Sequence, residues 1–136
     1  MTVHLLSPQG MSPGTLYHHV AVGTGTRHVH VAGQVGSRPD GEPGMPKGLQ
    51  GQVAQALRNT AVGLAAAGAS FTDTLRLTFY VVDWEPAKMP ELLVGIDEVA
   101  TELGLPIPLP PASLIGVASL FEPGVLVEVE ATALTD

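Results

Sequence analysis

The 136-residue sequence contains no cysteine. This absence excludes a disulfide scaffold, a thiolate metal site and a cysteine nucleophile. Long apolar runs are also missing, since none approaches the roughly 20 residues that a membrane-spanning helix needs. The first residues, Met1–Pro8, lack the basic segment and apolar core of a signal peptide. We therefore expect a cytoplasmic protein with no membrane partner.

Basic side chains are scarce. Six Lys and Arg stand against thirteen Asp and Glu, which gives a formal net charge of −7. Because nucleic acids are bound mainly through Lys and Arg at their phosphates, this balance argues against a nucleic-acid partner. The last basic residue is Lys88, and residues 89–136 contain no Lys or Arg. The apolar content of 45% is nevertheless sufficient for a folded core, and the length favours a single domain over residues 1–136.

Hydrophobic patterns predict the order of the secondary-structure elements. Apolar residues recur three or four apart between Leu49 and Leu64 and between Met89 and Leu103, which indicates two helices. Other segments alternate apolar or β-branched residues with polar ones between Gly and Pro, which indicates strands. The expected strands are residues 28–33, 75–81, 112–119 and 125–133. This order favours an α/β domain in which two helices pack on one face of a mixed sheet.

Five sequence motifs follow one another in order over residues 17–134. They are Val31-Ala-Gly-Gln34, Gln52-Val-Ala-Gln-Ala-Leu-Arg-Asn59, Leu64-Ala-Ala-Ala-Gly-Ala-Ser70 with Asp73, Phe79-Tyr-Val-Val-Asp83 and Val127-Glu-Val-Glu-Ala131. With these motifs the chain resembles the Rid family, also called YjgF or L-PSP, of reactive-intermediate or enamine/imine deaminases. The resemblance implies a chorismate-mutase-like fold with a mixed, mainly antiparallel sheet. It also implies a homotrimer with small-molecule clefts between its subunits and no cofactor.

The family's deaminases hydrolyse 2-imino acids or their enamine tautomers, and the resemblance implies two residues for this chemistry. A glutamate on the last strand helps to hold the attacking water; Glu128 matches it and is the candidate catalytic residue. An arginine in a Pro-Ala-Arg-Ser/Thr motif binds the substrate carboxylate through paired hydrogen bonds. Alignment from Val117-Ala-Ser-Leu120 places Ala112 at the arginine position and Ser113 after it, whereas a shift of one residue places Ser113 there. Neither is a cation, and residues 89–136 offer no nearby substitute.

Other residues match positions at the family's cleft. Tyr17 matches a tyrosine near the cleft, Gly33 a glycine whose backbone approaches the ligand, and Glu91 a position where many members have asparagine. His18 and His19 stand where small polar residues are usual, and they are candidate ligand contacts. The alternative for each histidine is a hydrogen-bonded structural role.

Three further features leave alternatives open. Glu130 shares a strand face with Glu128, either as its acid–base partner or as a solvated or hydrogen-bonded side chain. Arg76 either binds an anion from a neighbouring subunit or is solvated or salt-bridged. His28 and His30 share a strand face, but a metal site usually needs a third ligand and an ordered second shell, so no metal is expected.

Together these residues favour a Rid-family protein that acts on a small imine, enamine or related carbonyl metabolite at a cleft between subunits. Hydrolysis of a C=N bond is the expected activity, although Ala112 argues against a standard 2-imino acid deaminase. The alternative is a non-catalytic trimer on the same scaffold that binds a small molecule or a protein partner. Ribonuclease activity, which the family's name also carries, conflicts with the charge of −7.

Overall fold

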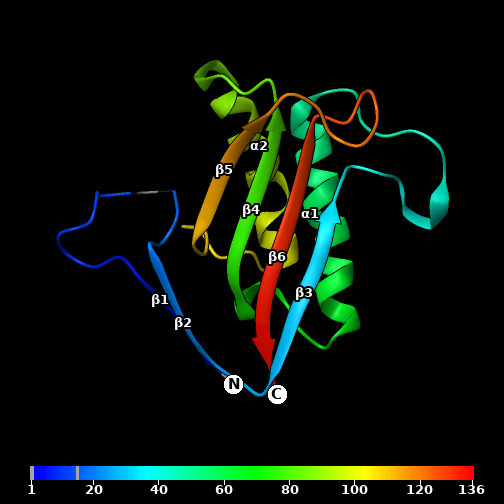
Figure 1. Ribbon diagram of the computed structural model, residues 1–136. Coiled ribbons are helices and arrows are strands. Elements are labelled where there is room, and N and C mark those ends of the chain that lie inside the picture. The colour runs from blue at the N-terminus through cyan, green and yellow to red at the C-terminus, as the bar shows by residue number, and fades with distance from the viewer. Residues whose placement is uncertain (1, 15) are drawn as a thin grey trace.

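The computed structural model describes residues 2–14 and 16–136 (Figure 1). Its elements, in chain order, are β1 (Thr2–Leu6), β2 (Val20–Thr24), β3 (Arg27–Gln34), α1 (Leu49–Ala66), β4 (Thr74–Val82), α2 (Met89–Leu103), β5 (Ala112–Val117) and β6 (Val127–Thr135). Both predicted helices and the four predicted strands are present. The hairpin of β1 and β2 is an addition that the sequence pattern does not predict. Within the described residues, no helix combines the length and the apolar character needed to cross a membrane.

The main sheet has four strands in the order β3-β6-β4-β5. Strand β6 pairs antiparallel with β3 and with β4, whereas β4 and β5 are parallel. The parallel pair is joined by α2, as a crossover between parallel strands requires. Both helices lie on the same face of the sheet (Figure 1). The sheet is therefore mixed and mainly antiparallel, as expected.

The core lies between this sheet and the helices. Alternate residues of β4 and β6 point toward the helices, among them Leu77, Phe79 and Val129, each at most 3% exposed. They pack with fully buried residues of α1 such as Leu57. Because successive side chains of a strand point to opposite faces, the intervening residues lie on the other side. We call this second, helix-free side the open face.

A buried glutamine links α1 to the segment that leads into β6. Gln52 is 1% exposed. Its Nε2 donates to the carbonyls of Pro46 at 2.8 Å and Gly124 at 2.9 Å, and its Oε1 accepts from the backbone N–H of Leu126 at 2.9 Å. The bonds to Gly124 and Leu126 join residues 72 and 74 positions apart. Gln52 therefore anchors the start of the strand that carries Glu128.

Candidate functional site

The register of the sheet brings polar residues of three strands together on the open face. Tyr80 on β4 is paired with Glu128 on β6, and Thr78 is paired with Glu130. Ser113 on β5 is paired with Thr78 from the other side. The face therefore presents a row of adjacent hydroxyl and carboxylate groups, although these residues are up to 52 positions apart in the sequence.

Glu128 lies directly against Gly33. The pairing of β3 with β6 is interrupted between Val31 and Gln34, so the strand bulges where Gly33 stands. A Cβ atom on Gly33 would lie 2.6 Å from Cδ and 2.7 Å from Cγ of Glu128, closer than any side chain allows. Only glycine leaves room for the Glu128 side chain in this position. Two residues predicted for the site are thus neighbours in one chain.

Replacing Gly33 by alanine is therefore expected to displace the Glu128 carboxylate while leaving the fold intact. The three nearest atoms that the new methyl group would meet all belong to the flexible Glu128 side chain. We expect imine turnover to fall about tenfold or more, since small misplacements of a catalytic group are costly. The check is a double-mutant cycle with Glu128→Ala. In that background Gly33→Ala should cost nothing further, and an equal loss in both backgrounds would contradict the contact.

Tyr80 and Glu130 form a hydrogen-bonded pair on the open face. The Tyr80 hydroxyl donates to Oε1 of Glu130 at 2.6 Å. This bond is the main cause that raises the pKa of Tyr80 above its ordinary 10.0, and partial burial and the negative charges of Glu130 and Glu128 act in the same direction. Arg76 opposes them. Tyr80 is therefore a neutral hydrogen-bond donor at neutral pH.

The raised pKa of Tyr80 has a measurable consequence. The hydrogen bond to Glu130 is fully present below pH 10, the ordinary tyrosine value, and is lost as the pH rises through the higher folded-state value. Titration of the phenolate absorbance should show one tyrosine with a midpoint above 10, which Tyr80→Phe removes. Glu130→Gln should lower this midpoint toward the ordinary value. An unchanged midpoint in Glu130→Gln would show that Glu130 is not the cause.

A cation does reach Ser113, one of the two residues aligned with the missing arginine. The Arg76 guanidinium on β4 hydrogen-bonds through Nη2 to the hydroxyl oxygen of Ser113 on β5. This contradicts the expectation that no basic residue lies near Ser113. The expectation considered residues close in sequence, whereas the parallel pairing of β4 and β5 brings together side chains 37 positions apart. Arg76 is exposed. The sequence left open whether it binds an anion or is solvated or salt-bridged, and the contact with Ser113 makes it a functional candidate.

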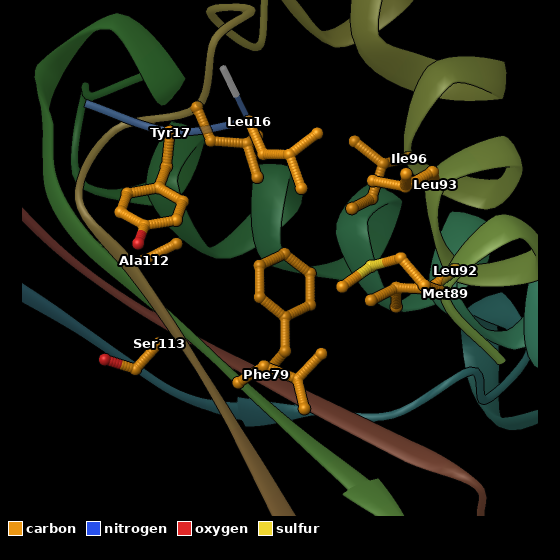
Figure 2. Close-up of a pocket in the computed structure, with 11 residues that line it drawn as sticks. Leu16, Tyr17, Phe79, Met89, Leu92, Leu93, Ile96, Ala112 and Ser113 are labelled. Atoms are coloured by element: carbon orange, nitrogen blue, oxygen red, sulfur yellow. The ribbon is translucent and has the colours of Figure 1, made fainter. Parts of the chain in front are cut away.

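Ala112 points away from Glu128 and toward the helices. It is paired with Leu77, whose side chain is fully buried in the core. Ala112 borders an apolar cavity of about 100 Å³ between α2 and the sheet. Figure 2 shows Tyr17 and Ala112 on one side of this cavity, Met89 of α2 across it, and the Ser113 hydroxyl pointing away from it. Of the two residues aligned with the family arginine, only Ser113 faces the same side as Glu128.

Tyr17 and the two following histidines belong to a segment packed against the residues before β5. Tyr17 forms a parallel bridge with Leu109, and the backbone N–H of His18 donates to the Leu109 carbonyl at 2.7 Å. The His18 Nδ1 lies 3.2 Å from the Ser7 hydroxyl. The His19 ring packs edge-on against Tyr17 at 5.3 Å, and its Nε2 lies 2.5 Å from a backbone carbonyl. Both histidines therefore have structural partners.

Glu91 lies apart from the open-face residues and from the residues at the apolar cavity. Its Oε1 accepts a hydrogen bond from the backbone N–H of Leu49 at 3.1 Å, at the first residue of α1. A carboxylate at a helix N-terminus is favoured by the helix dipole and satisfies a free N–H group. The predicted site residues other than the two histidines thus occupy three places in one chain: Glu128 with Gly33 and Ser113 on the open face, Tyr17 with Ala112 at the cavity, and Glu91 at α1.

The histidines of β3 do not assemble a larger cluster. The rings of His28 and His30 are stacked, with centroids 6.3 Å apart and an interplanar angle of 8°. Across residues 2–14 and 16–136, no group of three or more His, Asp or Glu is arranged to hold a metal ion. The pair therefore stands as two aromatic rings on the open face.

The fold and the comparisons with known proteins identify the family of this chain. The family model described as Endoribonuclease L-PSP matches residues 9–135. The chain belongs to this family, also called the Rid or YjgF family, and its architecture is the chorismate-mutase-like fold.

Solved structures of the same family resemble the chain over nearly its whole length. The Rid-family protein YyfB from Yersinia pestis, described as of unknown function, is 32% identical, with a TM-score of 0.83 over 98% of this chain and 99% of its own. The YjgF gene product from E. coli is 26% identical, with a TM-score of 0.67 over 94% and 92% of the two chains. Rv2704 from Mycobacterium tuberculosis is 26% identical, with a TM-score of 0.61 over 98% and 99%. Among curated proteins, none matches the chain significantly.

Proposed function

We propose that the protein hydrolyses the C=N bond of a small imine or enamine, or handles a related carbonyl metabolite, at a cleft between subunits of a homotrimer. The observation that carries this proposal is the placement of Glu128 over Gly33 on the open face. The Glu128 carboxylate takes part in no salt bridge among the described residues, and its position against the Gly33 backbone leaves it able to accept a proton from water. The family membership supports the reaction class.

Glu128 supplies the proton transfers that this hydrolysis needs. Its carboxylate accepts a proton from a water molecule as the water oxygen attacks the carbon of a protonated imine. The product is a tetrahedral carbinolamine, and Glu128 returns the same proton to its nitrogen. The C–N bond then breaks while the Glu128 carboxylate takes the second proton of the former water from the hydroxyl group. Glu128 passes this proton to the departing ammonia, so the products are a carbonyl compound and ammonium, and the carboxylate is restored. The neighbouring carboxylate of Glu130 accepts a hydrogen bond from the Tyr80 hydroxyl instead.

Substrate binding differs from that of a standard 2-imino acid deaminase. Ala112 offers no hydrogen-bond donor from its side chain and borders an apolar cavity. Truncating one partner of a buried, hydrogen-bonded charge pair costs about 2–5 kcal/mol, or roughly 30-fold to several thousand-fold in binding. We therefore expect ordinary 2-imino acids to be turned over weakly.

A homotrimer is the assembly that this site calls for. Tyr17 and Glu128 line different surfaces of one chain, and the open face leaves side chains such as Ile115 on the edge strand 43% exposed. A second copy packed on this side covers the exposed apolar groups and closes a cleft over Glu128. Sedimentation of the purified protein should give the mass of three chains, and a monomer would contradict this part of the proposal.

The reaction is tested by following ammonia release from freshly generated imines in the presence of the wild-type protein. Two substrate classes are compared, 2-imino acids and imines without a carboxylate, each against its uncatalysed rate. Accelerated release from either class supports the proposal, and turnover of 2-imino acids as fast as that of an arginine-bearing family member would contradict the interpretation of Ala112. No acceleration with any imine would instead favour the alternative.

The alternative is a non-catalytic trimer that binds a small molecule or a protein partner. The apolar cavity beside Ala112 favours it, because a cavity with so few polar groups is suited to binding rather than to proton transfer. Its expected signature is ligand binding without ammonia release. The two functions therefore differ in one measurable product.

A further inference from the structure

Arg76 stands out among the charged residues because its guanidinium has almost no partner. A guanidinium carries five N–H donors, and the described contact uses one of them, toward Ser113. The ion pair seen in the described part of the chain joins Arg58 to Glu102, and none there involves Arg76. Arg76 is also the single Lys or Arg that the described strands of the main sheet carry on the open face.

The surroundings of Arg76 are rich in donors. His30, Thr132 and Arg76 lie side by side on three adjacent strands. Together with Thr78 and Glu130 they line a hollow of about 200 Å³. The carboxylate of Glu130 also faces this hollow, but it accepts the hydrogen bond of the Tyr80 hydroxyl.

We propose that Arg76, with the hydroxyl of Ser113, binds the acidic group of the substrate on the open face, since neither Ala112 nor Ser113 supplies the family's arginine. The inference rests on the proposed function and narrows its substrate class to small imines, enamines or carbonyl compounds that carry a carboxylate. A guanidinium binds a carboxylate through two parallel N–H donors, and the serine hydroxyl supplies a third. The carboxylate then lies on the open face, the side on which Glu128 stands.

The strand that carries the guanidinium explains why carboxylate binding by Arg76 is compatible with weak turnover of ordinary 2-imino acids. The guanidinium reaches Ser113 from β4, whereas an arginine at position 113 would start from the edge strand β5. A carboxylate held from β4 places the adjoining C=N carbon differently relative to Glu128. The exposed guanidinium is also more strongly screened by water than a buried one.

The test is equilibrium binding of two stable probes, followed by NMR titration of the wild-type protein and of single variants. Pyruvate carries a carboxylate next to its carbonyl group, and pyruvamide is its neutral counterpart. We expect the wild type to bind pyruvate more tightly than pyruvamide. Arg76→Gln should weaken pyruvate binding about tenfold or more and leave pyruvamide unchanged. Arg58→Gln, which alters an arginine of α1 far from the open face, is the matched control.

Returning an arginine at a neighbouring position shows whether pyruvate binding depends on where the guanidinium lies or only on the net charge of the protein. In the Arg76→Gln background, Ser113→Arg returns the cation to the open face and should recover pyruvate binding. Ala112→Arg in the same background points toward the apolar cavity and should not. Pyruvate binding that is unchanged in Arg76→Gln, or no stronger than pyruvamide binding in the wild type, would overturn the proposal. Because no turnover is needed, absence of imine hydrolysis would refute the proposed reaction and leave this binding test valid.

Discussion

Replacing Glu128 by glutamine is expected to lower kcat/KM for imine hydrolysis by about 10²–10⁴-fold, the usual contribution of a general base. The amide is nearly isosteric with the carboxylate, so it fills the space above Gly33, but it accepts no proton from water. Because the loss lies in the chemical step, kcat should fall while KM changes little. Steady-state ammonia release with the best imine of the wild-type panel measures the effect.

Glu130→Gln is the matched control for this prediction. Glu130 lies on the same face two residues later, and the Tyr80 hydroxyl donates to it at 2.6 Å. An amide oxygen accepts this hydrogen bond too, so we expect a loss of less than about tenfold. Equal losses in both variants would show that the two carboxylates act as one unit. A larger loss in Glu130→Gln would show that Glu130, and not Glu128, is the general base.

The largest expected effect on stability comes from Gln52→Leu. Leucine fills a similar volume, but it leaves the N–H of Leu126 and the carbonyls of Pro46 and Gly124 without their partner. Each unsatisfied buried group costs about 1–3 kcal/mol, and water reaches part of this half-buried region, so we expect a total loss of roughly 2–4 kcal/mol. That is a large share of the roughly 5–15 kcal/mol by which domains are stable.

Chemical denaturation at fixed protein concentration measures this loss, since assembly makes stability depend on concentration. Gln55→Leu is the control, because Gln55 lies one turn away on the same helix and bonds only Asn59 among its described partners. It should change the free energy of unfolding by less than about 0.5 kcal/mol, as surface substitutions usually do. If Gln52→Leu is no more destabilising than Gln55→Leu, the anchoring role of Gln52 is wrong.

The main elements of the fold could be predicted from the sequence because their signals are local. The apolar stripe of α2 and its end at Gly104, with a φ of 64°, can both be read from neighbouring residues. The β1–β2 hairpin could not, because Thr2–Leu6 and Val20–Thr24 are separated by residues 7–19, far more than the two-residue turns that identify a hairpin from sequence. The pairing of two strands so far apart in the sequence depends on the tertiary fold and not on neighbouring residues.

The candidate site was predictable only in part for the same reason. Glu128 and Gly33 could be identified from motifs on two strands, and the register then places them in contact. The face on which Ala112 lies depends on its pairing with Leu77, which no local pattern reveals. Arg76 becomes relevant only through the parallel pairing of β4 with β5. Its place on a strand suggested a solvated side chain, and the structure adds the contact with Ser113.

A crystal structure of the protein soaked with pyruvate would test the central claim, that small carbonyl and imine compounds bind on the open face beside Glu128. We predict that pyruvate lies on the open face, on the side of Glu128, in a cleft formed by two subunits. Pyruvate bound instead in the apolar cavity beside Ala112, or at a surface remote from Glu128, would contradict this account.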